Sequence, residues 1–150
     1  MIIAIASALA LCCIGCASTD ANGTTDGETS ATAMMLALDE NVTVRVGTDP
    51  SGELLLDTST MEGFFASDHY DSKNPYAFAL VLTSDGKKAF RNATRELAKD
   101  QSPITLWAGE EAICSPVIGG MINTKYVILN IASVTDAESY QHVVDALNAE

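Results

Sequence analysis

Residues 76–82 read Tyr-Ala-Phe-Ala-Leu-Val-Leu, and this apolar run decides the fold. Both of its sets of alternate side chains are apolar, which predicts a strand inside a sheet that is at least partly covered on each face. The run breaks at Thr-Ser-Asp-Gly, residues 83–86, and a helical pattern follows over residues 87–100. After the break at Pro103, short apolar runs predict three more strands, over residues 104–108, 112–118 and 126–131.

Two predicted helices accompany these strands. The first has an apolar face made by Ala89, Phe90, Ala93 and Leu97. The second is expected to begin at Thr135 as N-cap, with Glu138 as its partner in a capping box. Its apolar face consists of Ala137, Tyr140, Val143, Val144 and Leu147. We expect an α+β domain of the ferredoxin-like (α/β plait) type, an antiparallel sheet with two helices packed on one face.

The residues before the central run predict shorter elements. Apolar and polar residues alternate over 42–46, which is typical of a half-buried strand, and residues 53–57 contain a possible short strand. Residues 58–69 are ambiguous. Met61, Phe64 and Phe65 lie at helical spacing, and Ser59 or Thr60 could cap a short helix there.

Residues 1–16 predict a signal peptide that ends in a lipobox-like cysteine. The apolar run after Met1 is shorter than the ~20 residues that span a bilayer, and it has the length of a signal-peptide core. Its end, Cys-Ile-Gly-Cys at 13–16, resembles a bacterial lipobox, so Cys16 is the predicted lipidation site. We expect an extracytoplasmic protein anchored to the cell membrane by this lipid. A plain secretory signal cleaved near Ala17 and a short uncleaved anchor are the alternatives.

Residues 17–33 contain no aromatic and no large aliphatic side chain. Such a segment cannot bury enough surface to offset the entropy of ordering it, which predicts a flexible polar tether before a folded domain at 34–150. Cleavage before Cys16 would leave two cysteines, the lipidated Cys16 and the thiol of Cys114, so no disulfide is expected within the mature chain.

The net charge of −12 argues against nucleic acid as a partner, because neutralising phosphates requires clustered cations that the chain as a whole lacks. Five of its eight cations fall within the first predicted helix. Four recur at every fourth residue and form a candidate basic docking face for anionic headgroups or an acidic partner: Lys87, Arg91, Arg95 and Lys99. The simpler interpretation is a solvated helix face.

The sequence offers no constellation of catalytic or metal-binding residues. His69 and His142 are far apart, and neither has metal-ligand spacing with cysteines or carboxylates. Cys114 has no indicated base and is better interpreted as a buried thiol. Gly119 and Gly120 lie between predicted strands, whereas a phosphate-binding loop opens a helix. We therefore expect no enzyme, no cofactor, no metal and no small-molecule substrate.

One region shows a family resemblance. Residues 110–120 read Glu-Glu-Ala-Ile-Cys-Ser-Pro-Val-Ile-Gly-Gly, and residues 78–90 form a strand followed by Asp-Gly-Lys-Lys-Ala-Phe. Together with the strand before residue 109 and the helix 135–148, they resemble SecD, the accessory subunit of the bacterial Sec translocon. The resemblance covers residues 54–150. It implies the head of the large extracytoplasmic domain, which in that family contacts translocating polypeptides.

The segment after the predicted strand at 112 also has a physical interpretation. Proline cannot donate to a sheet ladder, so Pro116 marks a sheet edge or a bulge. A candidate edge for adding an extended peptide is therefore made by Ser115, Pro116, Val117, Ile118, Gly119 and Gly120. The alternative is a purely structural hairpin. We accordingly expect a non-enzymatic domain that binds extended or translocating polypeptide or an export or envelope assembly. The alternative function is an envelope adaptor with one dedicated protein contact.

Overall fold

The computed structural model describes residues 34–70, 72–73 and 75–149. The predicted signal peptide, Cys16 and the tether lie outside the described residues. Nine elements follow in order: β1 (Val42–Val46), β2 (Leu54–Leu56), β3 (Met61–Ser67), β4 (Ala77–Leu82), α1 (Ser84–Asp100), β5 (Ile104–Ala108), β6 (Glu111–Cys114), β7 (Tyr126–Leu129) and α2 (Ala137–Leu147).

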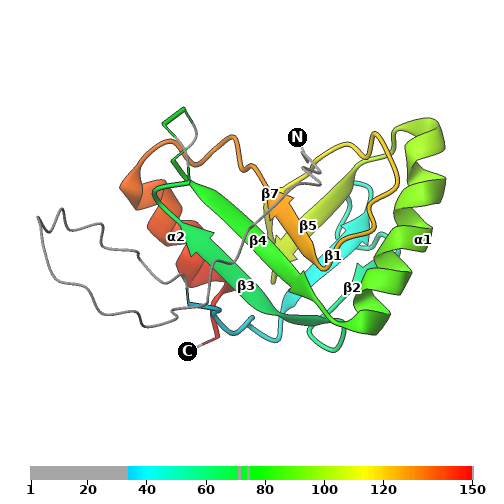
Figure 1. Cartoon of the computed structure of the whole chain (residues 1–150), viewed down its shortest axis with the longest axis horizontal. Coiled ribbons are helices and arrows are strands. Elements are labelled where there is room, and N and C mark those ends of the chain that lie inside the picture. The colour runs from blue at the N-terminus through cyan, green and yellow to red at the C-terminus, as the bar shows by residue number, and fades with distance from the viewer. Residues whose placement is uncertain (1–33, 71, 74, 150) are drawn as a thin grey trace, which may run out of the picture.

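The strands form two antiparallel sheets (Figure 1). The four-stranded sheet has the order β2-β1-β5-β6, and the three-stranded sheet has the order β3-β4-β7. The predicted α+β class, with antiparallel strands and two helices, is confirmed and is compatible with a ferredoxin-like arrangement. A single sheet with both helices on one face was predicted. In the structure the strands are shared between two sheets, and the helices lie at opposite ends of the molecule (Figure 1).

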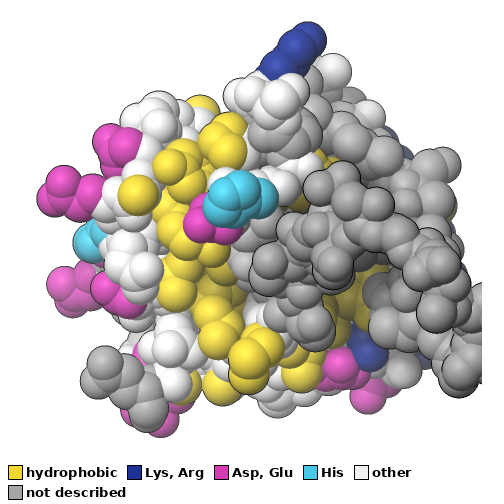
Figure 2. All heavy atoms as spheres, turned by 60° about the vertical axis from the view of Figure 1, so that its left-hand side comes forward, with side chains coloured by type: hydrophobic (Ala, Val, Ile, Leu, Met, Phe, Trp, Pro, Cys, Tyr) yellow, Lys and Arg dark blue, Asp and Glu magenta, His cyan; other side chains and the backbone are white. Residues whose placement is uncertain are grey.

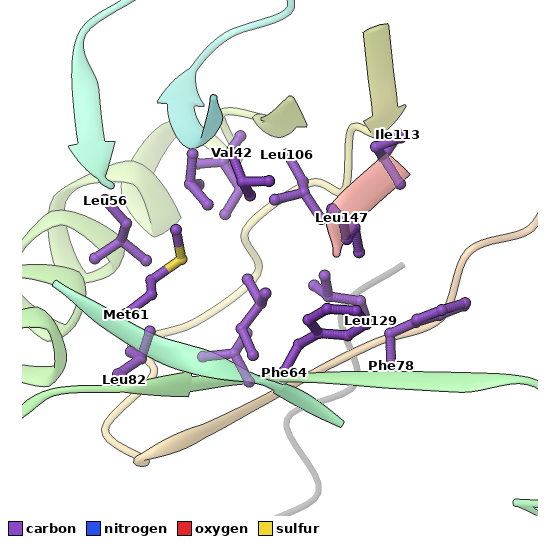
Figure 3. Close-up of a cluster of buried hydrophobic side chains, with 14 of the residues drawn as sticks. Val42, Leu56, Met61, Phe64, Phe78, Leu82, Leu106, Ile113, Leu129 and Leu147 are labelled. Atoms are coloured by element: carbon purple, nitrogen blue, oxygen red, sulfur yellow. The ribbon is translucent and has the colours of Figure 1, made fainter. Parts of the chain in front are cut away.

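The hydrophobic core lies between the two sheets (Figure 3). Val42 and Leu106 enter it from the four-stranded sheet, and Phe64 and Phe78 enter it from the three-stranded sheet. Because each sheet has one strongly apolar face, packing these faces together removes both from water. Full burial of a side chain as large as Phe64 stabilises the fold by roughly 1.5–3 kcal/mol.

The central apolar run forms β4, as predicted, and pairs with β3 on one side and β7 on the other. Phe78, Leu80 and Leu82 face the core, whereas Ala79 and Val81 face away from it. The outward side chains of β4 lie beside Phe65 of β3 and Ile128 of β7, so the outer face of this sheet is also apolar.

The ambiguous segment 58–69 contains the strand β3, and the possible short helix is not formed. A register shift between Met61 and Gly63 marks a β-bulge. The extra residue allows Met61 and Phe64 to face the core together although they are three positions apart, which is the spacing that resembled a helix. Gly63 also allows a close approach, since a Cβ there would lie 2.5 Å from the Leu36 carbonyl oxygen.

Both helices differ from the predictions at their ends. The first begins three residues earlier than expected, and the Thr83 hydroxyl accepts a hydrogen bond from the Gly86 backbone N–H at 3.0 Å. The predicted cap of the second helix was wrong by one residue. Asp136 is its N-cap and forms a capping box with Ser139. An aspartate carboxylate and a serine hydroxyl satisfy the free N–H groups at least as well as the predicted pair, Thr135 and Glu138.

Candidate functional site

The predicted peptide edge begins at the outer border of the four-stranded sheet. β6 is the last strand of that sheet, and it ends at Cys114, earlier than the predicted residue 118. From there the chain stays beside the start of β5, where Val117 forms an isolated antiparallel bridge with Pro103. The segment therefore prolongs the sheet edge past the end of the regular strand.

Two backbone hydrogen bonds fix the direction in which this edge faces. The Ile104 N–H donates to the Pro116 carbonyl at 3.0 Å, and the Ile118 N–H donates to the Ser102 carbonyl at 3.1 Å. In an antiparallel pair of this kind, the peptide groups of the residue between them point away from the partner strand. The N–H and C=O of Val117 therefore point outward, and within the described part of the chain they have no hydrogen-bond partner.

The six predicted edge residues alternate in their exposure. Pro116 and Ile118 are buried, whereas the Val117 side chain is 52 % exposed. Gly119 and Gly120 are exposed, and a Cβ at either would meet no atom within 4 Å. The structure thus brings the six residues together as one stretch with an exposed outer side.

Buried threonines hold this stretch in place, and the sequence analysis missed them. The Thr105 hydroxyl lies 2.8 Å from the Ser115 hydroxyl and donates to the Gly47 carbonyl at 2.6 Å. The Thr94 hydroxyl on α1 accepts a hydrogen bond from the Ile122 N–H at 2.9 Å. The burial of Thr94 could have been predicted from its position, because it lies four residues after Phe90 on the same helix face.

A contact with α2 limits the edge at its other end. Nε2 of His142 lies 2.8 Å from the Glu111 carboxylate at the start of β6. The hydrogen bond with Glu111, with a further Coulombic contribution from the same carboxylate, raises the pKa of His142 above its usual value. The side chain of His142 is exposed.

The predicted basic docking face lies along α1. Lys87 and Arg91 are half-buried, while Arg95 and Lys99 are exposed. Lys99 forms an ion pair with Glu96. Phe90 is buried, as predicted, together with Gly86 and Thr94, whereas Ala89, which was predicted to lie on the apolar side of this helix, is exposed.

The Cys114 thiol is a poor nucleophile in this environment. Burial raises its pKa to about 11, so almost none of it is thiolate at neutral pH. His69 does not serve as a base for this thiol, because its ring contacts the neighbouring Asp68 carboxylate. Among residues 34–70, 72–73 and 75–149, no group of three His, Cys, Asp or Glu side chains is arranged to hold a metal ion. No helix in this part of the chain has the length and apolar character required to cross a bilayer.

Comparison with solved structures finds one similar fold. It is that of SecDF, described as a membrane component that enhances protein export, with a TM-score of 0.55. The fold is SecD-like. Sequence identity is 16 %, so the likeness concerns the fold alone, and it covers 75 % of this chain and 62 % of the SecDF chain. This chain thus spans less than two thirds of the length of SecDF. No family model and no curated protein matches the sequence.

Proposed function

We propose that this protein is an extracytoplasmic, non-enzymatic binding domain that takes up extended polypeptide at the β6 edge. The observation that carries the proposal is the outward-facing backbone of Val117, next to the exposed Gly119-Gly120 pair. A free sheet edge binds an extended chain through main-chain hydrogen bonds, which are independent of the side chains of the bound peptide. That property suits a domain that meets many different polypeptides.

The similarity to SecDF supports a connection with protein export, since that protein is described as enhancing it. The proposed bound chain is a polypeptide in transit or one subunit of an export assembly. We further propose that the chain corresponds to the head of the SecD extracytoplasmic domain and is held at the membrane by a lipidated Cys16. The test of the anchor is Cys16→Ser, which should lower the mass of the mature protein by the lipid and release it from the membrane fraction.

The peptide edge can be tested by removing one N–H group. Val117→Pro removes the outward N–H but no hydrogen bond within the described fold, since the bonds to β5 belong to residues 116 and 118. Val117→Ala is the matched control because it shortens the same side chain and keeps the N–H. A photoreactive residue at Asn123, in the full chain, reports contacts with pulse-labelled exported proteins in cells.

We expect adducts with many exported chains, strongly reduced by Val117→Pro and largely kept by Val117→Ala. Equal adducts in both variants, at equal protein levels, would refute binding by strand addition. A single discrete adduct would instead favour the adaptor function.

A second observation favours that adaptor alternative. Hydrophobic side chains form a band on the face toward the α2 end of the molecule, bordered by acidic side chains (Figure 2). At this end the rings of Tyr76 and Tyr140 are in contact, with their centroids 5.2 Å apart, and both side chains are only half-buried. Exposed aromatic and aliphatic groups beside charged ones are typical of a surface for one protein partner.

A further inference from the structure

Positive and negative charges are separated between the two ends of the domain. α1 carries five cations and three carboxylates, although the net charge of the whole chain is −12. α2 contains Glu138 and Asp145 but no Lys or Arg. The two helices lie at opposite ends of the molecule (Figure 1), and acidic side chains gather on the face that includes the α2 end (Figure 2).

The cations of α1 lie beside exposed apolar side chains of the loop that follows the peptide edge. Lys87, Arg91 and Thr94 form one stripe, because residues four and seven positions apart share a helix face. The Thr94 hydroxyl binds the Ile122 N–H, so the loop crosses α1 next to Arg91. Met121 precedes this contact, and its side chain is 50 % exposed.

We call this combined surface the basic-apolar face. It consists of Lys87, Lys88, Arg91, Arg95, Val117 and Met121. Residues 115–124 contain no acidic side chain, so the loop adds no negative charge to it.

The four cations of this face are available to a ligand. In the described part of the chain, none of them has a carboxylate within ion-pair distance, whereas Lys99 pairs with Glu96 and Lys125 pairs with Glu62. Lys87, Arg91 and Arg95 follow one another at intervals of four residues, a spacing at which like charges repel. The buried Nε of Arg91 has no hydrogen-bond partner among the described residues.

We propose that the basic-apolar face rests on the anionic surface of a phospholipid membrane. Phosphate groups would neutralise the row of cations, and the exposed Met121 and Val117 side chains would enter the interfacial region beside them. A phospholipid surface offers anionic charge and hydrocarbon side by side, which matches a row of cations flanked by apolar groups. The acidic α2 end would be repelled from the same surface, so the domain would adopt one orientation.

The test uses the mature chain, residues 16–150 with Cys16→Ser, so that neither a lipid chain nor the apolar run 1–15 delivers the protein to the vesicles. Binding is measured by flotation with vesicles of phosphatidylcholine alone and of phosphatidylcholine and phosphatidylglycerol in equal parts. Each cation near an anionic surface contributes about a factor of five, so Arg91→Gln with Arg95→Gln should lower the partition coefficient about 30-fold. Lys73→Gln removes one charge from the loop before β4, at the other end of that strand from α1, and should lower it far less than Arg91→Gln alone.

Met121→Ser should weaken binding further without any change of charge, which separates membrane insertion from attraction alone. Three outcomes would overturn the proposal: equal binding by Lys73→Gln and Arg91→Gln, equal binding to both kinds of vesicle, or binding of polyglutamate in solution by a chain that ignores anionic vesicles. The last outcome would assign the face to an acidic protein. None of these measurements depends on peptide binding at the β6 edge.

Discussion

Replacing Thr94 by valine tests whether α1 holds the loop behind the peptide edge. Thr94 is 0 % exposed, and its hydroxyl accepts the Ile122 N–H at 2.9 Å while donating to the Phe90 carbonyl at 2.8 Å. Valine has nearly the same shape but cannot accept a hydrogen bond. The buried Ile122 N–H then loses its partner, a loss of about 1–3 kcal/mol. The new buried methyl group returns up to about 0.8 kcal/mol.

The expected net loss in the free energy of unfolding is therefore about 0.2–3 kcal/mol, measured by urea denaturation. Thr94→Ser is the control, because it keeps the hydroxyl and removes only a methyl group. The two variants should be separated best by amide hydrogen exchange at Ile122. Local opening at that amide should become roughly 5- to 150-fold more frequent in Thr94→Val, the ratio that corresponds to the lost bond, and change little in Thr94→Ser. Unchanged protection of Ile122 in the valine variant would show that the hydroxyl does not hold the loop.

Three further perturbations follow from the described contacts. Gly63→Ala should destabilise the protein by about 1–3 kcal/mol in urea denaturation, because the new Cβ would lie 2.5 Å from the Leu36 carbonyl oxygen, whereas Gly119→Ala should stay within about 0.5 kcal/mol. His142→Ala should lower the melting temperature at pH 5 but hardly at pH 8. The bond with Glu111 raises the folded-state pKa of His142. The stabilisation from this bond is therefore fully present below the unfolded-state pKa of His142 and is lost as the pH rises through its folded-state pKa. The pH dependence of this difference should vanish in a Glu111→Gln background, and its persistence there would assign it to another group. Burial raises the pKa of the Cys114 thiol to about 11, so its alkylation by iodoacetamide at pH 7.5 should be slow in the folded protein and rapid in urea, as followed by peptide mass spectrometry. Fast labelling of Cys114 itself in the native chain would contradict the described burial.

Local apolar patterns were sufficient to predict most strands and both helices. The run at 76–82 has two apolar faces, and β4 is indeed a central strand with neighbours on both sides. Pro116 predicted an edge because proline cannot continue a ladder, and β6 is the edge strand of its sheet. These features depend on residues that are close in sequence, which is why a single sequence contains them.

The features that the sequence did not indicate depend on distant partners. A glycine is needed at position 63 because the backbone of Leu36 approaches it from a separate segment. Thr94 and Thr105 resemble surface residues until the loops they bind are placed against them. The division of strands between two sheets likewise follows from how two apolar faces meet in space, and periodicity within one strand carries no information about that meeting.

The order of strands along the chain has a consequence for when this domain can fold. The chain crosses between the sheets repeatedly: β1 and β2 belong to one, β3 and β4 to the other, β5 and β6 to the first again, and β7 to the second. The inner strand β5 of the four-stranded sheet is therefore synthesised after both hairpins that precede it. A nascent or exported chain that has emerged only as far as α1 has two hairpins and no closed core. The core can therefore close only after the strands that follow α1 have been made.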